Sequence, residues 1–224
     1  FCASIAFSNN TAIIGDPTGD ANGRVHLYTR TSDGGGWTNQ AAPGLAPPPE
    51  VPANSNFGRS IGLSEDLAIV GATEQNGTGT ATLFQRSDGV WSSVITLTGQ
   101  ESDQFGWSVD IESRPTEAFF VVGASLGGDV HGDRNGLVYL YRWDESTQSV
   151  TLEATFEPHI IHIQSGFGVS VDLDIDTAGD VVVAVGNARE HEESVGSVDI
   201  LRRDHKTGIW THEQTIEPGD EFSD

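Results

Sequence analysis

The sequence of 224 residues predicts an all-β protein built from four repeated units. A motif of the form Phe-Gly-x-Ser-(Val/Ile), which we call the opening motif, begins three of the units, at Phe57, Phe105 and Phe167. After each opening motif come a hydrophobic run that ends in glycine and a glycine-led alternating segment. A period of roughly fifty residues with four short strands in each unit is typical of the four-stranded antiparallel blades of a β-propeller.

The opening motifs divide the chain into the units 1–56, 57–104, 105–166 and 167–221. The first unit begins with Phe1-Cys2-Ala3-Ser4-Ile5, with cysteine where the opening motif has glycine, and Phe222-Ser223 begins a further copy. In each opening motif we expect the phenylalanine to pack between neighbouring units. The glycine lets the chain turn tightly into the first strand, and the serine hydroxyl satisfies a backbone group.

Four strands are expected in each unit, with the strand of the opening motif innermost. The second strand is the hydrophobic run, at 12–15, 68–71, 120–123 and 183–186. The third is the glycine-led segment, at 23–28, 79–84, 136–141 and 196–201. The fourth begins at Trp37, Trp91, Val150 or Trp210. Alternation with period two between Gly, Asp, Asn and Ser boundaries indicates strands with one buried face, and no segment has a sustained helical period.

The composition excludes several classes of partner. The net charge is −22, with 33 acidic residues against 11 Lys and Arg. Binding to nucleic acid needs clusters of basic residues that neutralise phosphates, so this class is excluded, and anionic lipid surfaces are disfavoured for the same reason. The sequence contains no apolar run of about twenty residues, so direct membrane insertion is not expected.

The opening motif followed by a Val-Gly-Ala run resembles the FG-GAP repeats of integrin alpha-chain propellers and of many surface proteins. Gly71-Ala72 and Gly123-Ala124 carry the Gly-Ala of that signature, while Gly15-Asp16 and Gly186-Asn187 are degenerate copies. Propellers of this family typically have seven blades. The resemblance therefore implies that the four units form an open arc within a longer array, and that the protein is extracellular or at the cell surface.

Four aspartates in the fourth unit resemble the calcium loops of integrin-type propellers. Asp172, Asp174, Asp176 and Asp180 stand at positions 1, 3, 5 and 9 of the segment, and hard cations are bound by such gathered oxygens. The glycine, however, stands at position 8 instead of position 6. The alternative is a longer first strand with an acidic face, followed by a hairpin turn at 177–180.

Two further polar loops are candidate binding sites at one rim of the propeller, for a cation or a sugar. Their residues are Asp16, Asp20 and Asn22 in the first unit, and Asp129, His131, Asp133 and Asn135 in the third. The same residue types also simply form turns. Two glycosylation sequons begin at Asn9 and Asn76 and favour an extracellular setting.

Two motifs for catalysis are missing from the sequence, which contains no His-Glu-x-x-His and no phosphate-binding Gly-Lys-Ser/Thr. The pattern Gly-x-Ser-x-Gly occurs at 58–62 and 123–127, where it is part of the repeated units. We therefore expect a non-catalytic binding or adhesion scaffold that engages a protein or glycan through its rim loops. The alternative is an accessory β-propeller domain of a larger secreted enzyme or receptor. A possible calcium ion is the only cofactor that the sequence suggests.

Overall fold

The computed structural model describes residues 2–31, 35–40, 45–73, 77–128, 134–159, 166–188 and 196–217. These residues form four antiparallel sheets of four strands each, and within each sheet the strands follow one another in chain order. The predicted all-β fold with four four-stranded antiparallel sheets is therefore confirmed. In the part of the chain that is described, no helix is long and apolar enough to cross a membrane.

The sixteen strands fall into four consecutive groups of four. The first sheet contains β1 (Ser4–Ser8), β2 (Thr11–Asp16), β3 (Arg24–Arg30) and β4 (Trp37–Gln40). The second contains β5 (Ser60–Ser64), β6 (Leu67–Ala72), β7 (Thr80–Ser87) and β8 (Val90–Thr98). The third contains β9 (Phe105–Ser113), β10 (Glu117–Ala124), β11 (Leu137–Asp144) and β12 (Ser149–Phe156). The fourth contains β13 (Phe167–Ile175), β14 (Val181–Asn187), β15 (Ser197–Arg203) and β16 (Trp210–Ile216).

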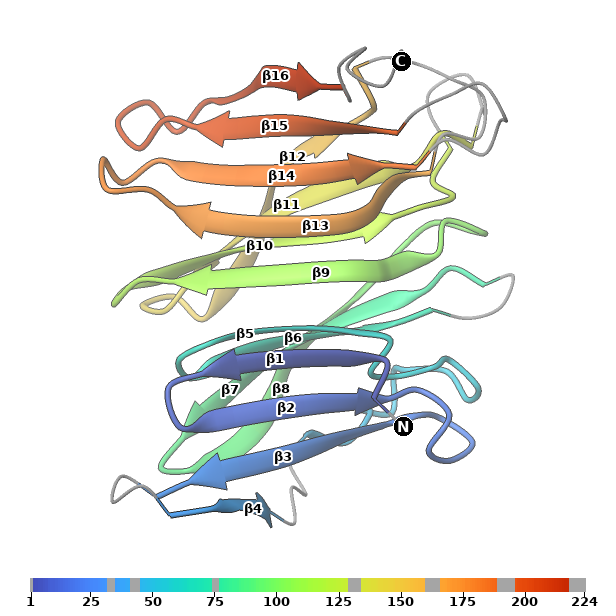
Figure 1. Ribbon diagram of the computed structural model, residues 1–224, viewed down its shortest axis with the longest axis vertical. Coiled ribbons are helices and arrows are strands. Elements are labelled where there is room, and N and C mark those ends of the chain that lie inside the picture. Colours follow the sequence, from blue (N-terminus) through green and yellow to red (C-terminus); the bar gives the residue numbers. More distant parts are fainter. Residues whose placement is uncertain are drawn as a thin grey trace, which may run out of the picture.

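Neighbouring sheets meet along their first strands. The main contacts between sheets join β1 to β5, β5 and β6 to β9, and β9 and β10 to β13, so the first strand of a sheet always takes part. The strand of each opening motif is therefore the innermost strand of its sheet, as the sequence predicts. The first and fourth sheets lie at opposite ends of the molecule, so the described strands form an open arc (Figure 1).

The phenylalanines of the opening motifs fill the interfaces between sheets. Phe57, Phe105 and Phe167 are at most 1% exposed. Phe57 lies in one core cluster with Ile13 and Leu27 of the preceding sheet. Each of the other two likewise shares a cluster with β-strand residues of the sheet before it. Because burying an aromatic ring removes a large apolar area from water, these contacts are a main source of cohesion between sheets.

The glycines of the opening motifs are required for two physical reasons. Gly58, Gly106 and Gly168 all adopt positive φ, between 83° and 89°, which disfavours residues that carry a Cβ atom. In addition, a Cβ atom at these positions would collide with a carbonyl oxygen at the start of the third strand of the preceding sheet. Cys2, which replaces glycine in the first unit, also adopts a positive φ of 68°.

The serines of the opening motifs link each sheet to the next. Ser4, Ser60 and Ser108 donate their hydroxyl protons to the carbonyl oxygens of the glycine in the following opening motif, over 2.9, 2.8 and 2.7 Å. The phenylalanines complete the link, because their backbone N–H groups donate to the carbonyl oxygens of Asn22, Thr78 and Asn135. We call this set of contacts between two successive sheets a joint. The predicted role of the serine is therefore confirmed at all three joints.

Candidate binding surfaces

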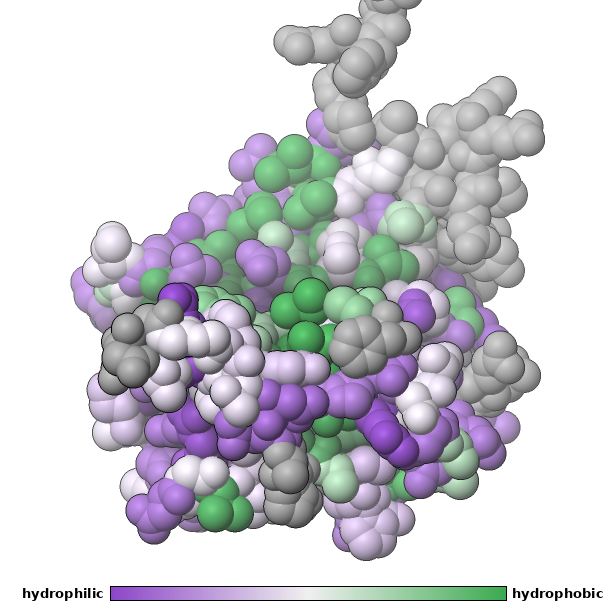
Figure 2. Space-filling model, turned by 60° about the horizontal axis from the view of Figure 1, so that its bottom comes forward, coloured by the Kyte–Doolittle hydropathy of each residue, from purple (hydrophilic) through white to green (hydrophobic). Residues whose placement is uncertain are grey.

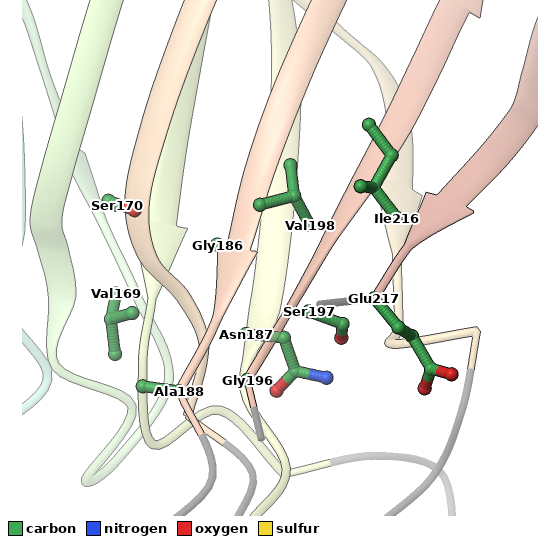
Figure 3. A pocket seen from close by; sticks show the side chains of 10 residues that line it. All are labelled: Val169, Ser170, Gly186, Asn187, Ala188, Gly196, Ser197, Val198, Ile216 and Glu217. Atoms are coloured by element: carbon green, nitrogen blue, oxygen red, sulfur yellow. The ribbon is translucent and has the colours of Figure 1, made fainter. Parts of the chain in front are cut away.

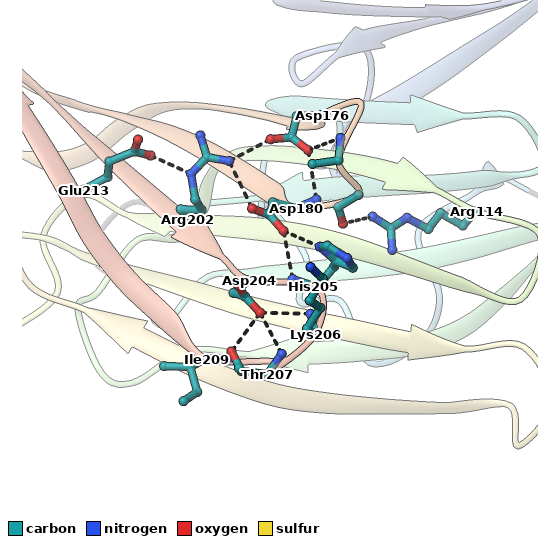
Figure 4. A network of polar contacts seen from close by, with 12 residues as sticks. Arg114, Asp176, Asp180, Arg202, Asp204, His205, Lys206, Thr207, Ile209 and Glu213 are labelled. Carbon is teal, nitrogen blue, oxygen red and sulfur yellow. Dashed lines mark hydrogen bonds and ion pairs between the residues drawn. The ribbon is translucent and has the colours of Figure 1, made fainter.

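The turn between β13 and β14 holds two of the four predicted calcium ligands (Figure 4). Asp176 Oδ1 accepts hydrogen bonds from the N–H groups of Ala178 and Asp180, at 2.9 and 3.0 Å. Asp176 Oδ2 lies 2.7 Å from Arg202 Nη1, and this ion pair is the main reason why the pKa of Asp176 is lowered. These contacts shape a hairpin turn, which is the alternative that the sequence left open.

The second carboxylate of the turn, Asp180, is also engaged by protein groups. Its Oδ1 accepts a hydrogen bond from the backbone N–H of His205, at 2.9 Å, and contacts the Nδ1 of the same residue at 2.7 Å. Its Oδ2 lies 3.4 Å from Arg202 Nη1. The hydrogen bonds from His205 are the largest cause of the lowered pKa of Asp180. Both carboxylates of the turn are therefore already engaged by neighbouring protein groups.

Asp172 and Asp174 lie apart from the turn, on β13. They are exposed, and they pair across the strand ladder with Ala184 and Val182 of β14. Within the described residues, no three His, Cys, Asp or Glu side chains are gathered as metal ligands. Two of the four aspartates thus lie on a regular strand and two are held by Arg202 and His205, so a calcium ion that bound all four would require these contacts to rearrange.

Calcium binding remains a prediction that calorimetry can test. Because Arg202 already pairs with Asp176, a calcium ion would have to compete with a guanidinium group. We therefore expect any rise in melting temperature with millimolar calcium to be larger in Arg202→Ala than in the natural sequence, and absent in Asp176→Ala. Equal melting temperatures with and without calcium in all three proteins would remove the site.

The predicted rim loop of the first unit is held by its own contacts. Asp20 Oδ2 forms an ion pair of 2.8 Å with Arg24 Nε, and Asp20 Oδ1 accepts the N–H of Asn22 at 2.9 Å. Asp16, at the end of β2, lies 3.7 Å from the Nε2 of His26. These contacts are typical of a turn, and ligand binding by this loop stays a prediction.

Two predicted binding residues serve the joints between sheets. The carbonyl oxygens of Asn22 and Asn135 accept the N–H groups of Phe57 and Phe167, each at 2.9 Å. Asn135 is fully buried. Three other predicted residues of the loop in the third unit, Asp129, His131 and Asp133, lie outside the described residues.

The sequon at Asn9 lies in the tight turn between β1 and β2. Asn9 is exposed and adopts a positive φ of 52°. The threonine of this sequon, Thr11, is buried and its hydroxyl accepts a hydrogen bond of 3.0 Å from Arg86 Nη1. Asn9 therefore has the exposure that a glycan requires. Asn76, the asparagine of the second sequon, lies outside the described residues.

A groove of about 450 Å³ runs between the second and third sheets, on the side of the β5–β6 and β9–β10 turns. We call it the polar groove. Its lining combines carboxylate, amide and guanidinium groups from both sheets, chiefly Glu65, Gln85, Arg86, Arg114, Glu145 and Gln148. No pattern in the sequence indicates this site, because its members come from separate turns that only the fold brings together.

The polar groups of the groove are held in place by their neighbours. Gln85 Nε2 donates to both oxygens of Glu145, at 2.9 and 3.0 Å, and Trp143 Nε1 donates to Glu145 Oε2 at 3.1 Å. Arg86 Nε lies 2.6 Å from Asp66 Oδ1, and its guanidinium lies over the ring of Trp91. Ligand-binding groups fixed in this way lose less conformational entropy when a ligand binds.

A second, apolar pocket of about 490 Å³ lies on the outer face of the fourth sheet (Figure 3). Val198 and Ile216, neighbours across β15 and β16, are 36% and 48% exposed there. On the face seen in Figure 2, hydrophilic residues dominate the lower half and hydrophobic residues gather in the upper half. The two pockets thus differ in chemistry: one is polar and lies between sheets, and the other is apolar and lies on an end sheet.

Comparison with known families agrees with the spacing of the opening motifs. Residues 91–141, from β8 to β11, match the family model described as FG-GAP repeat. The resemblance to FG-GAP repeats is therefore confirmed by the middle of the chain, and the other sheets repeat the same strand order and joints. No curated protein sequence matches the chain significantly.

The solved structures that are similar to the chain include two of NanB sialidase. A mutant from Streptococcus pneumoniae and NanB with Optactamide each give a TM-score of 0.50 at 12% identity. The alignments cover 83% and 82% of this chain, but only 27% and 26% of the sialidase chains. The chain thus spans about a quarter of the length of these relatives. At this identity the likeness shows the fold alone, and the four sheets are arranged as propeller blades.

Proposed function

We propose that this protein is a non-catalytic binding scaffold that engages a protein or glycan ligand through the polar groove, outside the cell or at its surface. The observation that carries the proposal is the fixed set of groups around Glu145. Its carboxylate is held by Gln85 and Trp143 and lines a groove of about 450 Å³. Convergent polar groups in a concave site are a common form of ligand recognition.

The chemistry of the groove suits a ligand rich in hydroxyl or amide groups. Carboxylate and amide oxygens accept hydrogen bonds, while the guanidinium groups of Arg86 and Arg114 donate them. Both arginines are held by other protein groups: Arg86 forms an ion pair with Asp66, and Arg114 donates a hydrogen bond to the carbonyl oxygen of Gly179. Sugars and peptide backbones present donors and acceptors side by side, so both classes match this lining.

An array of glycans and a pull-down from extracellular fluid test this proposal. We expect Glu145→Ala to weaken ligand binding by roughly tenfold or more, because it removes a charged acceptor and releases Gln85. Glu213→Ala is the matched control, since it removes a carboxylate that pairs with Arg202 far from the groove. A ligand that binds both variants with the affinity of the natural sequence would exclude the groove as its site.

The extracellular setting rests on the FG-GAP resemblance and on the exposed sequon at Asn9. We also propose that the four sheets belong to a propeller of roughly seven blades, the number that the FG-GAP resemblance implies. Exposed apolar side chains on both end sheets support this. Ile5 and Phe7 of β1 are 62% and 60% exposed, and Val198 and Ile216 of the fourth sheet are 36% and 48% exposed.

The alternative function is an accessory propeller domain within a larger secreted enzyme or receptor. The same exposed apolar faces favour it, because a contiguous apolar surface is often covered by another domain. The sequence of the complete gene separates the two functions. A flanking hydrolase domain would favour the accessory role, whereas a signal peptide followed by further repeats would favour the binding scaffold.

A further inference from the structure

We propose that the outer face of the fourth sheet is a socket for one particular strand: a Phe-Gly-x-Ser opening strand supplied by polypeptide outside these 224 residues. The socket is the apolar pocket of Figure 3, and the residues that carry the argument are Ser170, Gly186, Asn187, Ser197, Val198 and Ile216. This inference concerns how the protein is joined to a partner, and it is independent of the polar groove.

The three joints of the structure define what such a socket needs. In each, the serine of one opening motif donates to the carbonyl of the glycine in the next. In each, a glycine near the end of the second strand lies against that same carbonyl, so closely that a Cβ atom would collide with it; these are Gly15, Gly71 and Gly123. The phenylalanine of the incoming motif covers apolar residues of the sheet before it. The joints therefore repeat one recognition geometry.

The fourth sheet carries the same parts at the same places. Ser170 corresponds to Ser108, and Gly186 corresponds to Gly123. In the third sheet Val138 pairs with Phe156, and in the fourth sheet Val198 pairs with Ile216. Val138 is fully buried beneath the next sheet, whereas Val198 is 36% exposed. The fourth sheet thus presents to solvent the surface that the other three sheets use to hold an opening strand.

Buried polar atoms in the pocket give an independent sign of a missing strand. Asn187 and Ser197 line the pocket and are only 2% and 5% exposed. The amide atoms of Asn187 and the hydroxyl of Ser197 have no hydrogen-bond partner among the described residues. The hydroxyl of Thr80, which holds the position of Ser197 in the second sheet, is also unpartnered although that joint is occupied, so the sign rests on the Asn187 amide. Buried polar groups are usually satisfied, and a docked strand would bring backbone donors and acceptors to this amide.

A docked strand would also suit the acidic row of β13, by which we mean the exposed residues Asp172 and Asp174. In the joint between the third and fourth sheets, Asp110 Oδ2 accepts the backbone N–H of Leu173 at 2.7 Å. Asp172 holds the corresponding position in the fourth sheet and is exposed. A docked opening strand would present an N–H to Asp172 as Leu173 does to Asp110.

The socket selects glycine at the second position of the docked motif. At the existing joints a Cβ atom on this residue would meet a backbone carbonyl oxygen of the preceding sheet, such as that of Thr80 for Gly106. The two degenerate copies of the motif in this chain have a side chain there: Cys2, and Ser223, which lies outside the described residues. Neither fits, so the strand that fits is a Phe-Gly strand of another polypeptide segment.

Nuclear magnetic resonance titration with an acetylated peptide of residues 57–64 tests the socket on the full chain. We expect saturable shifts of the amide resonances of Ser170, Gly186 and Val198. Peptides with Gly58→Ala or Phe57→Ala should bind roughly tenfold more weakly or worse, because of the backbone collision and the lost ring. Equal binding of the Gly58→Ala peptide, or shifts confined to other sheets, would overturn the proposal.

A tethered copy of the same peptide tests the socket even if the free peptide binds too weakly to be detected. Residues 57–64, joined after Asp224 through a Gly-Ser linker, should raise the melting temperature, because tethering supplies a millimolar effective concentration. Val198→Asp should remove the increase. Ile95→Asp should keep it, since Ile95 is also 36% exposed but lies on β8. The proposal is wrong if the tether has no effect, or if both variants lose its effect alike.

Discussion

Replacing Phe105 by alanine should lower the free energy of unfolding by about 3–5 kcal/mol, the usual range for a buried phenylalanine. The ring is 1% exposed and lies with its centroid 5.2 Å from that of Tyr139 and 6.5 Å from that of Tyr141. It fills the joint between the second and third sheets, so the cavity would lie at the middle of the arc. Urea denaturation followed by tryptophan fluorescence measures the loss.

Phe7→Ala is the matched control for that experiment. Phe7 also lies on a first strand, but it is 60% exposed on the outer face of the first sheet. Its ring touches that of Trp37 at a centroid distance of 5.6 Å, so a loss of up to about 1 kcal/mol is expected. Equal losses for the two variants would mean that the joints do not hold the sheets together.

Asp110→Asn should stabilise the protein at neutral pH and flatten its dependence on pH. Burial raises the pKa of Asp110 to about 6, against the hydrogen bond from the N–H of Leu173, and the charges of Asp172 and Asp174 add to the rise. Glu112, on the same strand, faces the same acidic row and also has a raised pKa. The ionised form of Asp110 is therefore disfavoured in the folded protein.

The sign of the effect follows from linkage. Because the pKa is higher in the folded state than in the unfolded state, the folded protein binds the proton more tightly. This stability is fully present below about pH 4 and is lost as pH rises through about 6. The loss has an upper limit of about 3 kcal/mol, since one pKa unit corresponds to about 1.4 kcal/mol. Asparagine keeps an oxygen for the N–H of Leu173 but carries no charge.

Chemical denaturation between about pH 4 and pH 8 measures this difference. The natural sequence should lose stability across the range, and Asp110→Asn should lose less, with a remaining slope from groups such as Glu112. Asp88→Asn, a change at an exposed turn with positive φ that asparagine tolerates, should follow the natural sequence. If stability depended on pH in the same way in all three proteins, the predicted effect of the raised pKa of Asp110 would be contradicted.

The repeat made the architecture predictable from sequence. The spacing of the opening motifs indicated the number of sheets, and each residue of the motif has the physical role expected of it, as Phe105, Gly106 and Ser108 illustrate. Local pattern was sufficient here because each sheet is one contiguous stretch of chain. The joints add contacts only between successive units, so the fold does not depend on strand pairing between distant parts of the chain.

The candidate sites were less predictable, because they depend on contacts between distant residues. Asp176 is a predicted calcium ligand, and the sequence gives no sign that the fold places Arg202, 26 residues further along the chain, at its carboxylate. Glu145 gave no signal in the sequence, yet the fold places Gln85, 60 residues earlier, against it. Asn22 resembled a rim residue, but its backbone carbonyl, which no side-chain pattern reports, is what holds Phe57.

Cys2 has a consequence for how copies of this arc associate. The two ends of the arc are unlike: its first sheet begins with an opening strand, and its fourth sheet carries the socket. Molecules with such unlike ends tend to stack into open-ended filaments. Cys2 keeps a positive φ of 68° and carries a Cβ atom, which would hinder docking of the first strand into the socket of another copy. A copy that docked through this strand would bring the Cβ of Cys2 to a place where the three joints have glycine.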